Sequence, residues 1–196
     1  MHEHVTDPYV QRANREGYRS RAAYKLLQID SRDNLLRPGM TVVDLGAAPG
    51  GWSQVAAGRT KPSGRVIAVD LLEMPPIPGV AFLRGDFEDS EMLARIKAQL
   101  AGNLVDLVIC DLAPNLSGIG PSDQARAIRL AEQALEFAKG LLQPEGTFLV
   151  KIFQGAGFEE FAAAMRRAFA RVVARKPGAS RARSREVYLL GKGVRL

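Results

Sequence analysis

The chain has 196 residues, enough for one domain with a substantial core and too few for two ordinary domains, so we expect a single domain over residues 1–196. Its hydrophobic content of 46% suits a globular protein, and no apolar run approaches the roughly 20 residues that a membrane-spanning helix needs. The net charge of +6 favours a polyanionic partner.

Helices and strands are predicted to alternate along the first half of the chain. Ser20 is expected to cap a helix whose apolar positions are Ala23, Leu26, Leu27 and Ile29. The pair Pro38-Gly39 then breaks the chain. The next predicted elements are a buried strand over 41–45, a glycine-rich turn over 46–51, a helix over 52–57, strands over 65–70 and 80–84, a helix over 90–100 and a strand over 105–111.

The second half continues the alternation. It is predicted to hold a long amphipathic helix over 122–142, a strand over 146–153, a helix over 158–169, and two strands around 172–173 and over 186–190. The strand segments are continuously apolar rather than strictly alternating. This pattern indicates an α/β fold with a parallel sheet that helices cover on both faces.

Polar residues mark the carboxyl ends of the predicted strands. They are Asp44, Asp70, Asp86, Asp111 and Lys151. Because ligands of parallel α/β sheets bind beyond the carboxyl ends of the strands, these side chains predict a ligand site at that edge.

The turn after the first strand favours S-adenosylmethionine over a dinucleotide. Its glycines are spaced Gly46-x-x-x-Gly50-Gly51, which is not the dinucleotide fingerprint, and this weakens a nicotinamide dehydrogenase hypothesis. A carboxylate at Asp44 suits the cationic amino-acid end of S-adenosylmethionine, and Asp70 can accept from the ribose hydroxyls. Asp86, with Phe87 alongside, is expected at the adenine amine.

The candidate cofactor residues extend along both segments. They are Asp44, Gly46, Pro49, Gly50, Gly51, Trp52, Asp70, Leu71, Asp86, Phe87 and Asp111. For Trp52, packing in the core and lining the cofactor site are equally favoured, and the two roles are compatible.

Basic residues gather near both ends of the chain. The first cluster holds Arg12, Arg15, Arg19, Arg21 and Lys25, and the second holds Arg166, Arg167, Arg171, Arg175, Lys176, Arg181, Arg183 and Arg185. Either cluster alone is compatible with a solvated surface, but two clusters that flank a glycine-rich centre favour an RNA-binding face. The predicted RNA contacts are Arg19, Arg21, Arg181, Arg183 and Arg185.

The N-terminal residues are polar and lack the apolar stretch of a secretory signal, so we expect a cytoplasmic protein without a membrane partner. Cys110, the only cysteine, lies in an apolar run and is expected to be buried. The two histidines lie near the N-terminus, and no metal-ligand spacing is present, so no metal is expected.

Several segments resemble the motifs of the FtsJ family of ribose 2′-O-methyltransferases. They are residues 42–54, Asp111-Leu-Ala-Pro-Asn115, residues 150–155, residues 175–188 and residues 20–26, and the similarity runs from Asp7 to the end. The resemblance implies a Rossmann-like methyltransferase fold with a mostly parallel seven-stranded sheet. It also implies that residues 1–38 form a basic, helical segment of the RNA site.

The resemblance further implies a reaction and a substrate. S-adenosylmethionine would donate a methyl group, leaving S-adenosylhomocysteine, to the 2′-hydroxyl of a uridine in large-subunit (23S) ribosomal RNA. The expected target is the A-loop on the assembled subunit, and the expected state is a monomer. An alternative is an RNA-binding ribosome-assembly factor whose methyltransferase activity is incidental or lost.

The family's catalytic tetrad falls on Lys25, Asp111, Lys151 and Glu186. Methyl transfer to a ribose hydroxyl requires removal of its proton as the new bond forms. Two roles remain open for Lys151: a general base that Asp111 orients, or a charged group that stabilises the developing alkoxide. Enzymes that methylate exocyclic amines carry an Asn/Asp-Pro-Pro-aromatic motif at the position of residues 111–115, and its absence here favours an oxygen acceptor.

Overall fold

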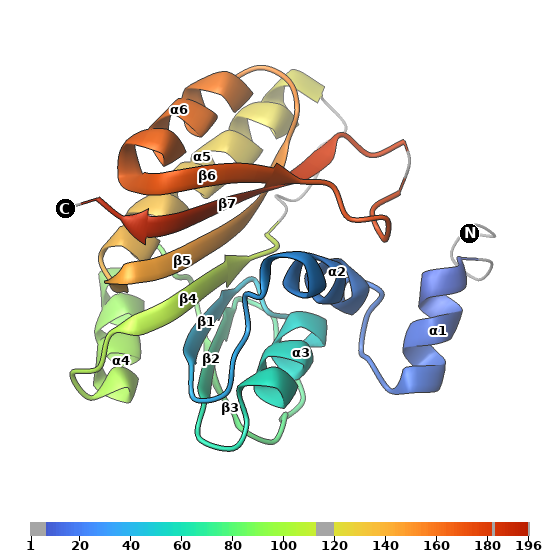
Figure 1. The fold of residues 1–196 in the computed structure, drawn as a ribbon, viewed down its shortest axis with the longest axis vertical. Helices are drawn as coiled ribbons and strands as arrows, with labels where there is room; N and C mark the ends of the chain where they lie inside the picture. The colour runs from blue at the N-terminus through green and yellow to red at the C-terminus, as the bar shows by residue number, and fades with distance from the viewer. Residues whose placement is uncertain (1–6, 113–119, 182, 196) are drawn as a thin grey trace.

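A computed structural model describes residues 7–112, 120–181 and 183–195 (Figure 1). The first half holds α1 (Pro8–Glu16), α2 (Ala23–Asp33), β1 (Thr41–Leu45), α3 (Gly51–Thr60), β2 (Arg65–Asp70), β3 (Val80–Arg84), α4 (Ser90–Leu100) and β4 (Val105–Cys110). The second half holds α5 (Gly120–Lys139), β5 (Leu142–Phe153), α6 (Phe158–Ala168), β6 (Phe169–Arg175) and β7 (Glu186–Val194).

The strands form one seven-stranded sheet in the order β3-β2-β1-β4-β5-β7-β6. The pairs among β1 to β5 are parallel, whereas β7 runs antiparallel to both β5 and β6. The predicted α/β fold with a mostly parallel sheet is confirmed. The insertion of β7 between β5 and β6 places Glu186 opposite Phe153, at the carboxyl end of β5.

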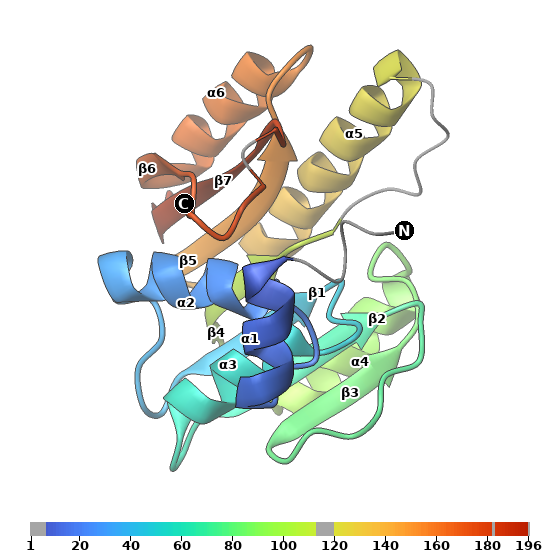
Figure 2. The ribbon, with the colours of Figure 1, turned by 90° about the vertical axis from the view of Figure 1, so that its right-hand side faces the viewer.

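Helices lie on both faces of the sheet (Figures 1 and 2), and alternate residues of β1 and β4 belong to two different cores. Val43 and Val108 belong to the core formed with α4, α5 and α6, while Val42 and Leu107 belong to the core formed with α2 and α3. Burial on both faces explains why the strand sequences are continuously apolar. Within the described residues, no helix combines the length and apolar character needed to cross a membrane.

The helix α1 lies outside the layer of α2 and α3 (Figure 1). The side chain of Asp7 accepts from the backbone N–H of Tyr9 at 2.9 Å and caps the helix, and Gly17 ends it with φ +77°. Ala13 is its one buried residue and packs in a small cluster with Tyr24. The sequence prediction gave no bounds for this helix, although Asp7, Pro8 and Gly17 are local signals for its start and end.

The predicted cap at Ser20 is wrong, because α2 begins only at Ala23 with Ala22 as its N-cap. Residues 20–22 form turns instead, in which the N–H of Ala23 donates to the carbonyl of Ser20 at 3.3 Å. A Cβ on Gly51 would lie 2.5 Å from the Ser20 hydroxyl oxygen. Ser20 is thus packed against the first residue of α3, a tertiary contact that a local capping rule does not anticipate.

The boundary between α5 and β5 also differs from the prediction. The helix ends at Lys139, three residues before the expected end, and β5 begins at Leu142 instead of Gly146. Leu142 pairs with Val105, and the register between β4 and β5 then shifts before Leu107 meets Thr147. Residues 143–145 are Gln-Pro-Glu, a polar segment with a proline, which does not match the apolar pattern of a buried strand.

Candidate active site

The glycine-rich turn joins β1 to α3 and is tightly packed. Gly46 and Gly50 have φ of +75° and +111°, and the Ala48–Pro49 peptide bond is cis. A Cβ on Gly46 would lie 2.2 Å from the Leu112 side chain, and one on Gly50 would lie 2.7 Å from Ile77. Glycine at both positions therefore lets the turn approach the end of β4 and the β2–β3 connection.

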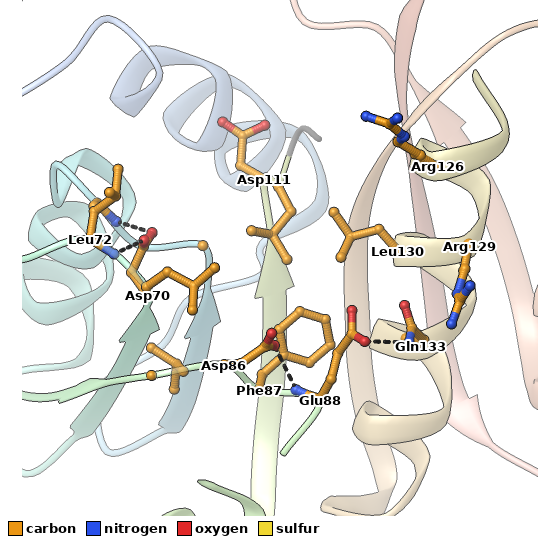
Figure 3. Close-up of a pocket in the computed structure, with 16 residues that line it drawn as sticks. Asp70, Leu72, Asp86, Phe87, Glu88, Asp111, Arg126, Arg129, Leu130 and Gln133 are labelled. Atoms are coloured by element: carbon orange, nitrogen blue, oxygen red, sulfur yellow. Dashed lines mark hydrogen bonds between the residues drawn. The ribbon is translucent and has the colours of Figure 1, made fainter. Parts of the chain in front are cut away.

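A cavity of about 590 Å³ opens at the carboxyl ends of β1, β2 and β4 (Figure 3). Its lining includes six of the predicted cofactor residues, namely Gly46, Asp70, Leu71, Asp86, Phe87 and Asp111. This volume is within the usual range of small-molecule sites.

Backbone donors fix two of the carboxylates that line the cavity. The Asp70 carboxylate accepts from the N–H of Ala48 at 2.9 Å and from the N–H of Leu72 at 2.8 Å. The Asp86 carboxylate accepts from the N–H of Glu88 at 2.9 Å. Each carboxylate oxygen can accept more than one hydrogen bond, so both groups keep acceptor capacity for hydroxyls or amines.

Asp44 lies beneath the turn and does not line the cavity. It is fully buried, and one carboxylate oxygen accepts from the Ser53 hydroxyl at 2.6 Å while the other has no hydrogen-bond partner. Burial raises the pKa of Asp44 to about 7, and the charges of Asp111 and Asp70 add to the rise against the Ser53 hydrogen bond.

The remaining predicted cofactor residues form the turn and its support. Pro49, Gly50 and Gly51 shape the backbone but do not line the cavity. Trp52 is 3% exposed, donates its indole N–H to the carbonyl of Ala22 at 2.7 Å, and lies 5.7 Å from the Tyr188 ring. The structure therefore places Trp52 in the core between α2 and β7.

The opposite wall of the cavity comes from α5, which sequence reasoning missed. Arg126, Arg129, Leu130 and Gln133 line this wall, and the Gln133 amide donates to Glu88 at 2.6 Å (Figure 3). Their spacing of three or four residues is the only signal in the sequence, because it places them on one face of the helix.

The four tetrad residues come from different elements and form two ion pairs. Lys151, on β5, lies 3.1 Å from an Asp111 carboxylate oxygen and donates to the Asp111 carbonyl at 2.8 Å. Lys25, on α2, lies 2.6 Å from a Glu186 carboxylate oxygen. The four side chains are between 8% and 15% exposed. Such burial distinguishes these pairs from the solvated surface pairs that contribute little.

Tyr188 lies between the two ion pairs and was not among the predicted site residues. Its hydroxyl donates to the Asp111 carboxylate at 2.8 Å, and the Lys25 ammonium lies 5.9 Å from its ring centre. Burial raises the pKa of Tyr188 well above its usual value, so the hydroxyl stays a donor. In the sequence its signals are its place at the end of the family-like segment 175–188 and its position two residues after Glu186, on the same side of β7.

Glu186 remains a carboxylate in this environment. Burial raises the pKa of its side chain, but the surrounding hydrogen bonds and positive charges, chiefly those of Lys25, together outweigh burial and hold the pKa below its usual value. The Lys176 ammonium also donates to the Glu186 carbonyl at 2.8 Å.

A basic hollow of about 430 Å³ adjoins Lys25 and Glu186. Arg21, Arg181 and Arg183 line it. Arg21 also donates to the Asp7 side chain and to the Ala179 carbonyl. Arg185 lines a separate hollow of about 600 Å³ between α5 and residues 156–157. The predicted RNA contact Arg19 lies elsewhere, with its guanidinium donating to three backbone carbonyls.

Cys110 is 1% exposed, as predicted. Burial raises the pKa of its thiol to about 12, which leaves it without nucleophilic character at neutral pH. Of the motif Asp111-Leu-Ala-Pro-Asn115, the last three residues lie outside the described part of the chain.

The fold and the site define an α/β protein with a cavity of small-molecule size at the carboxyl edge of its parallel strands. A model of the FtsJ-like methyltransferase family matches residues 18–194. The chain belongs to the FtsJ-like methyltransferase family, and its fold is the Rossmann-like fold that the resemblance implied.

Individual relatives agree with this assignment. The chain is 61% identical over 191 residues to the ribosomal RNA large subunit methyltransferase E of Methylobacillus flagellatus, covering 97% of this chain and 92% of that protein. It is 62% identical over 192 residues to the protein of the same name in Thiobacillus denitrificans, covering 98% and 87%. A solved Plasmodium falciparum structure, named as a ribosomal RNA methyltransferase, has a TM-score of 0.83 at 29% identity and covers 90% of this chain and 98% of that one.

Proposed function

We propose that this protein transfers a methyl group from S-adenosylmethionine to a ribose 2′-hydroxyl of large-subunit ribosomal RNA. The observation that carries the proposal is the position of Asp111, which lines the cofactor cavity and also holds Lys151. One residue thus connects the methyl donor with the group that acts on the acceptor. The names of the relatives support ribosomal RNA as the substrate. The finer proposal is a uridine in the A-loop of the assembled subunit.

The residues around the cavity fit S-adenosylmethionine. This cofactor supplies an electrophilic methyl group on a sulfonium. Asp70 is proposed to accept from the ribose hydroxyls, and Asp86, with Phe87 beside it, to meet the adenine. Asp44 is proposed to act on the cationic amino-acid end from beneath the turn, since its buried oxygen without a partner would be stabilised by a nearby cation. No metal takes part in this proposal.

Lys151 has two possible roles in the transfer, and its contacts favour one. Its ammonium faces the carbonyl and a carboxylate oxygen of Asp111, which leaves Lys151 as a donor. We therefore assign it to stabilising the alkoxide that develops on the ribose as the hydroxyl proton passes to solvent water, with Asp111 fixing the position of Lys151. Lys25 and Glu186 complete the acceptor side of the site, next to the basic hollow.

The basic hollow and the arginines near it are proposed to bind RNA phosphates. These residues are Arg21, Arg181, Arg183 and Arg185, which flank the two ion pairs on the chain segments 20–25 and 180–186. We further propose that the chain acts as a single methyltransferase domain, with residues 1–38 on the RNA side, and as a monomer in the cytoplasm. Few large apolar side chains are exposed among the described residues, which supports the monomer.

The test of this function is transfer of labelled methyl from S-adenosylmethionine to large ribosomal subunits that lack the modification, followed by nucleoside analysis. We expect 2′-O-methyluridine as the product. A methylated base would contradict the proposed acceptor. Absence of transfer while the cofactor still binds would favour the alternative, an RNA-binding assembly factor.

The role of Lys151 is tested by Lys151→Ala. We expect turnover to fall by about 10²–10⁴-fold, the usual contribution of one electrostatic or proton-transfer group, while RNA affinity is retained. Single-turnover rates and filter binding measure the two quantities. Lys139→Ala, at an exposed lysine of α5, is the matched control and should leave both unchanged. An unaltered rate in Lys151→Ala would exclude the catalytic assignment.

A further inference from the structure

Arg19 lies in the connection between α1 and α2 and has an unusual set of partners for a surface arginine. One terminal nitrogen of its guanidinium donates to the carbonyls of Pro75 at 2.6 Å and Pro49 at 3.3 Å. The other terminal nitrogen donates to the carbonyl of Pro76 at 2.8 Å. All three acceptors are backbone carbonyl oxygens of prolines. The guanidinium therefore holds the backbone of these segments in place and does not pair with an acidic side chain.

These contacts join two segments of the cofactor site. Pro49 belongs to the glycine-rich turn after β1, and Pro75 and Pro76 belong to the connection between β2 and β3. Met74 and Ile77 of that connection are buried in a small apolar cluster with Ala47 and Ala68. Arg19 adds hydrogen bonds to the apolar contacts that hold the connection in place.

The backbone of Arg19 is itself fixed. Its N–H donates to the side-chain oxygen of Gln54 at 2.8 Å, and the amide nitrogen of Gln54 donates back to the carbonyl of Gly17 at 3.0 Å. Gln54 lies on α3, the helix that begins directly after the glycine-rich turn. The guanidinium therefore projects from an anchored position.

The connection that Arg19 holds begins with two residues that line the cavity, Leu71 and Leu72. They are 61% and 68% exposed, the highest values among the large apolar residues in the described ranges. The N–H of Leu72 also fixes the Asp70 carboxylate at 2.8 Å. A shift of this connection would displace both the apolar wall and a donor that orients Asp70.

We propose that Arg19 is a positioning residue for cofactor binding, which clamps the β2–β3 connection against the glycine-rich turn, and is not an RNA phosphate contact. The inference rests on the proposed function, because it assumes that the cavity takes S-adenosylmethionine. The same chain segment continues to Arg21 and Lys25, so Arg19 links the wall of the cofactor site to the acceptor side.

A lysine at position 19 distinguishes the positioning role from an RNA phosphate contact, because it can replace the charge of the arginine but not its hydrogen-bond geometry. A lysine at position 19 keeps the positive charge that a phosphate contact needs. Its single ammonium does not reproduce the planar fork that reaches Pro49 and Pro75 on one side and Pro76 on the other. If Arg19 contacts an RNA phosphate, Arg19→Lys should preserve that contact. If Arg19 clamps the two backbone segments, Arg19→Lys should break the clamp.

The experiment measures binding of S-adenosylmethionine by calorimetry and of a large-subunit RNA fragment by filter binding, for wild type, Arg19→Lys and Arg19→Ala. In both variants we expect the cofactor Kd and KM to rise about tenfold, consistent with the loss of one or two charge-assisted hydrogen bonds. RNA affinity and kcat should stay within about twofold. Arg181→Lys and Arg181→Ala serve as the matched pair, and there the alanine variant should weaken RNA binding alone.

Three results would overturn the proposal. The first is weaker RNA binding in Arg19→Ala that Arg19→Lys restores, since it identifies a phosphate contact. The second is an unchanged cofactor Kd in Arg19→Lys. The third is a parallel loss of cofactor and RNA binding with a lowered melting temperature, which indicates general damage to the fold. Failure of the wild-type protein to bind S-adenosylmethionine would instead refute the proposed function itself.

Discussion

At the scale of single residues, Asp44 combines complete burial with an acidic side chain. Folding raises the pKa of this carboxyl from 3.8 to about 7, chiefly through burial. The unfolded chain therefore releases the proton at a lower pH than the folded chain does. The contribution of this group to stability is complete below about pH 3.8 and is lost as the pH rises toward 7.

The variant Asp44→Asn tests this pH dependence. Asparagine retains an acceptor for the Ser53 hydroxyl and does not titrate. We expect the unfolding free energy of the wild type to fall relative to Asp44→Asn by on the order of 2–4 kcal/mol between pH 4 and pH 7.5. Urea unfolding at several pH values measures the difference. Glu145→Gln, at an exposed position of β5, should track the wild type, and a pH-independent difference between Asp44→Asn and wild type would contradict the assignment.

The predicted site residues at strand ends were easier to place than those on helices. Asp70, Asp86 and Asp111 line the cavity because the carboxyl ends of parallel strands share one edge of the sheet. Asp44 follows the same rule in the sequence, but the turn above it covers its side chain. The α5 residues and Tyr188 depend on how elements pack against one another, and a periodic pattern alone does not say which neighbour a helix face meets.

At the scale of elements, α2 is attached to the antiparallel end of the sheet by charged contacts. The Arg175 guanidinium donates to both Asp33 carboxylate oxygens, at 2.7 and 2.6 Å, and the Lys192 ammonium donates to the Asp33 carbonyl at 3.0 Å. The Arg175 and Asp33 side chains are 15% and 9% exposed. These contacts bind the end of the helix that carries Lys25 to β6 and β7.

The variant Arg175→Gln is expected to lower the unfolding free energy at pH 7 by about 1–3 kcal/mol, because Asp33 would lose a bidentate, partly buried partner. The hydrogen bond from Arg175 lowers the pKa of Asp33 below 3.8 in the folded protein. Its stabilisation is therefore present above about pH 3.8 and is lost as the pH falls through the lowered value, so the two proteins should converge in acid.

Urea unfolding at pH 7 and near pH 2.5 measures this convergence. Arg166→Gln is the control, because the Arg166–Glu159 pair is exposed and 3.9 Å apart. It should change the unfolding free energy by less than about 0.5 kcal/mol. An equal loss of unfolding free energy in both variants would show that the Arg175–Asp33 pair stabilises the fold no more than an exposed pair does.

Elements with a complete local pattern were predicted well. The bounds of β1, β2, β3 and α4 agree with the sequence prediction, because apolar runs or helical spacing end at clear breaks there. The bounds of α3, α5, β6 and β7 differ from the prediction by several residues, and α1, the start of α2 and the first residues of β5 were not predicted. At the start of α2 and of β5, contacts with distant segments decide the structure, such as Ser20 against Gly51 and Leu142 beside Val105.

At the scale of the whole molecule, basic residues from both ends of the chain converge on one hollow. Arg21 and Lys25 come from the N-terminal part, and Arg181 and Arg183 come from the loop before β7. RNA affinity should therefore fall with salt, with a slope of about −0.7 in the logarithmic plot for each neutralised phosphate.

We expect Arg181→Ala to weaken RNA binding and to reduce the magnitude of this slope by about 0.7, corresponding to one phosphate contact. Filter binding between about 50 and 200 mM salt measures it. Arg65→Ala is the matched control, since Arg65 is exposed at the opposite, amino-terminal end of β2. An equal change of the slope in both variants would mean that RNA affinity depends on the net charge of the protein and not on a phosphate contact of Arg181.

The position of β7 also has a consequence for protein synthesis. In the described sheet, β6 pairs only with β7, and β7 lies between two strands that precede it in the chain. A nascent chain therefore contains β1 to β4, and with them the strand-derived wall of the cofactor cavity, before the strand carrying Glu186 and Tyr188 emerges. Translation supplies β7 within about a few seconds of β6. Until then, an unfinished chain lacks the strand that carries Glu186 and Tyr188, so the proposed acceptor side of the site forms only when synthesis is almost complete.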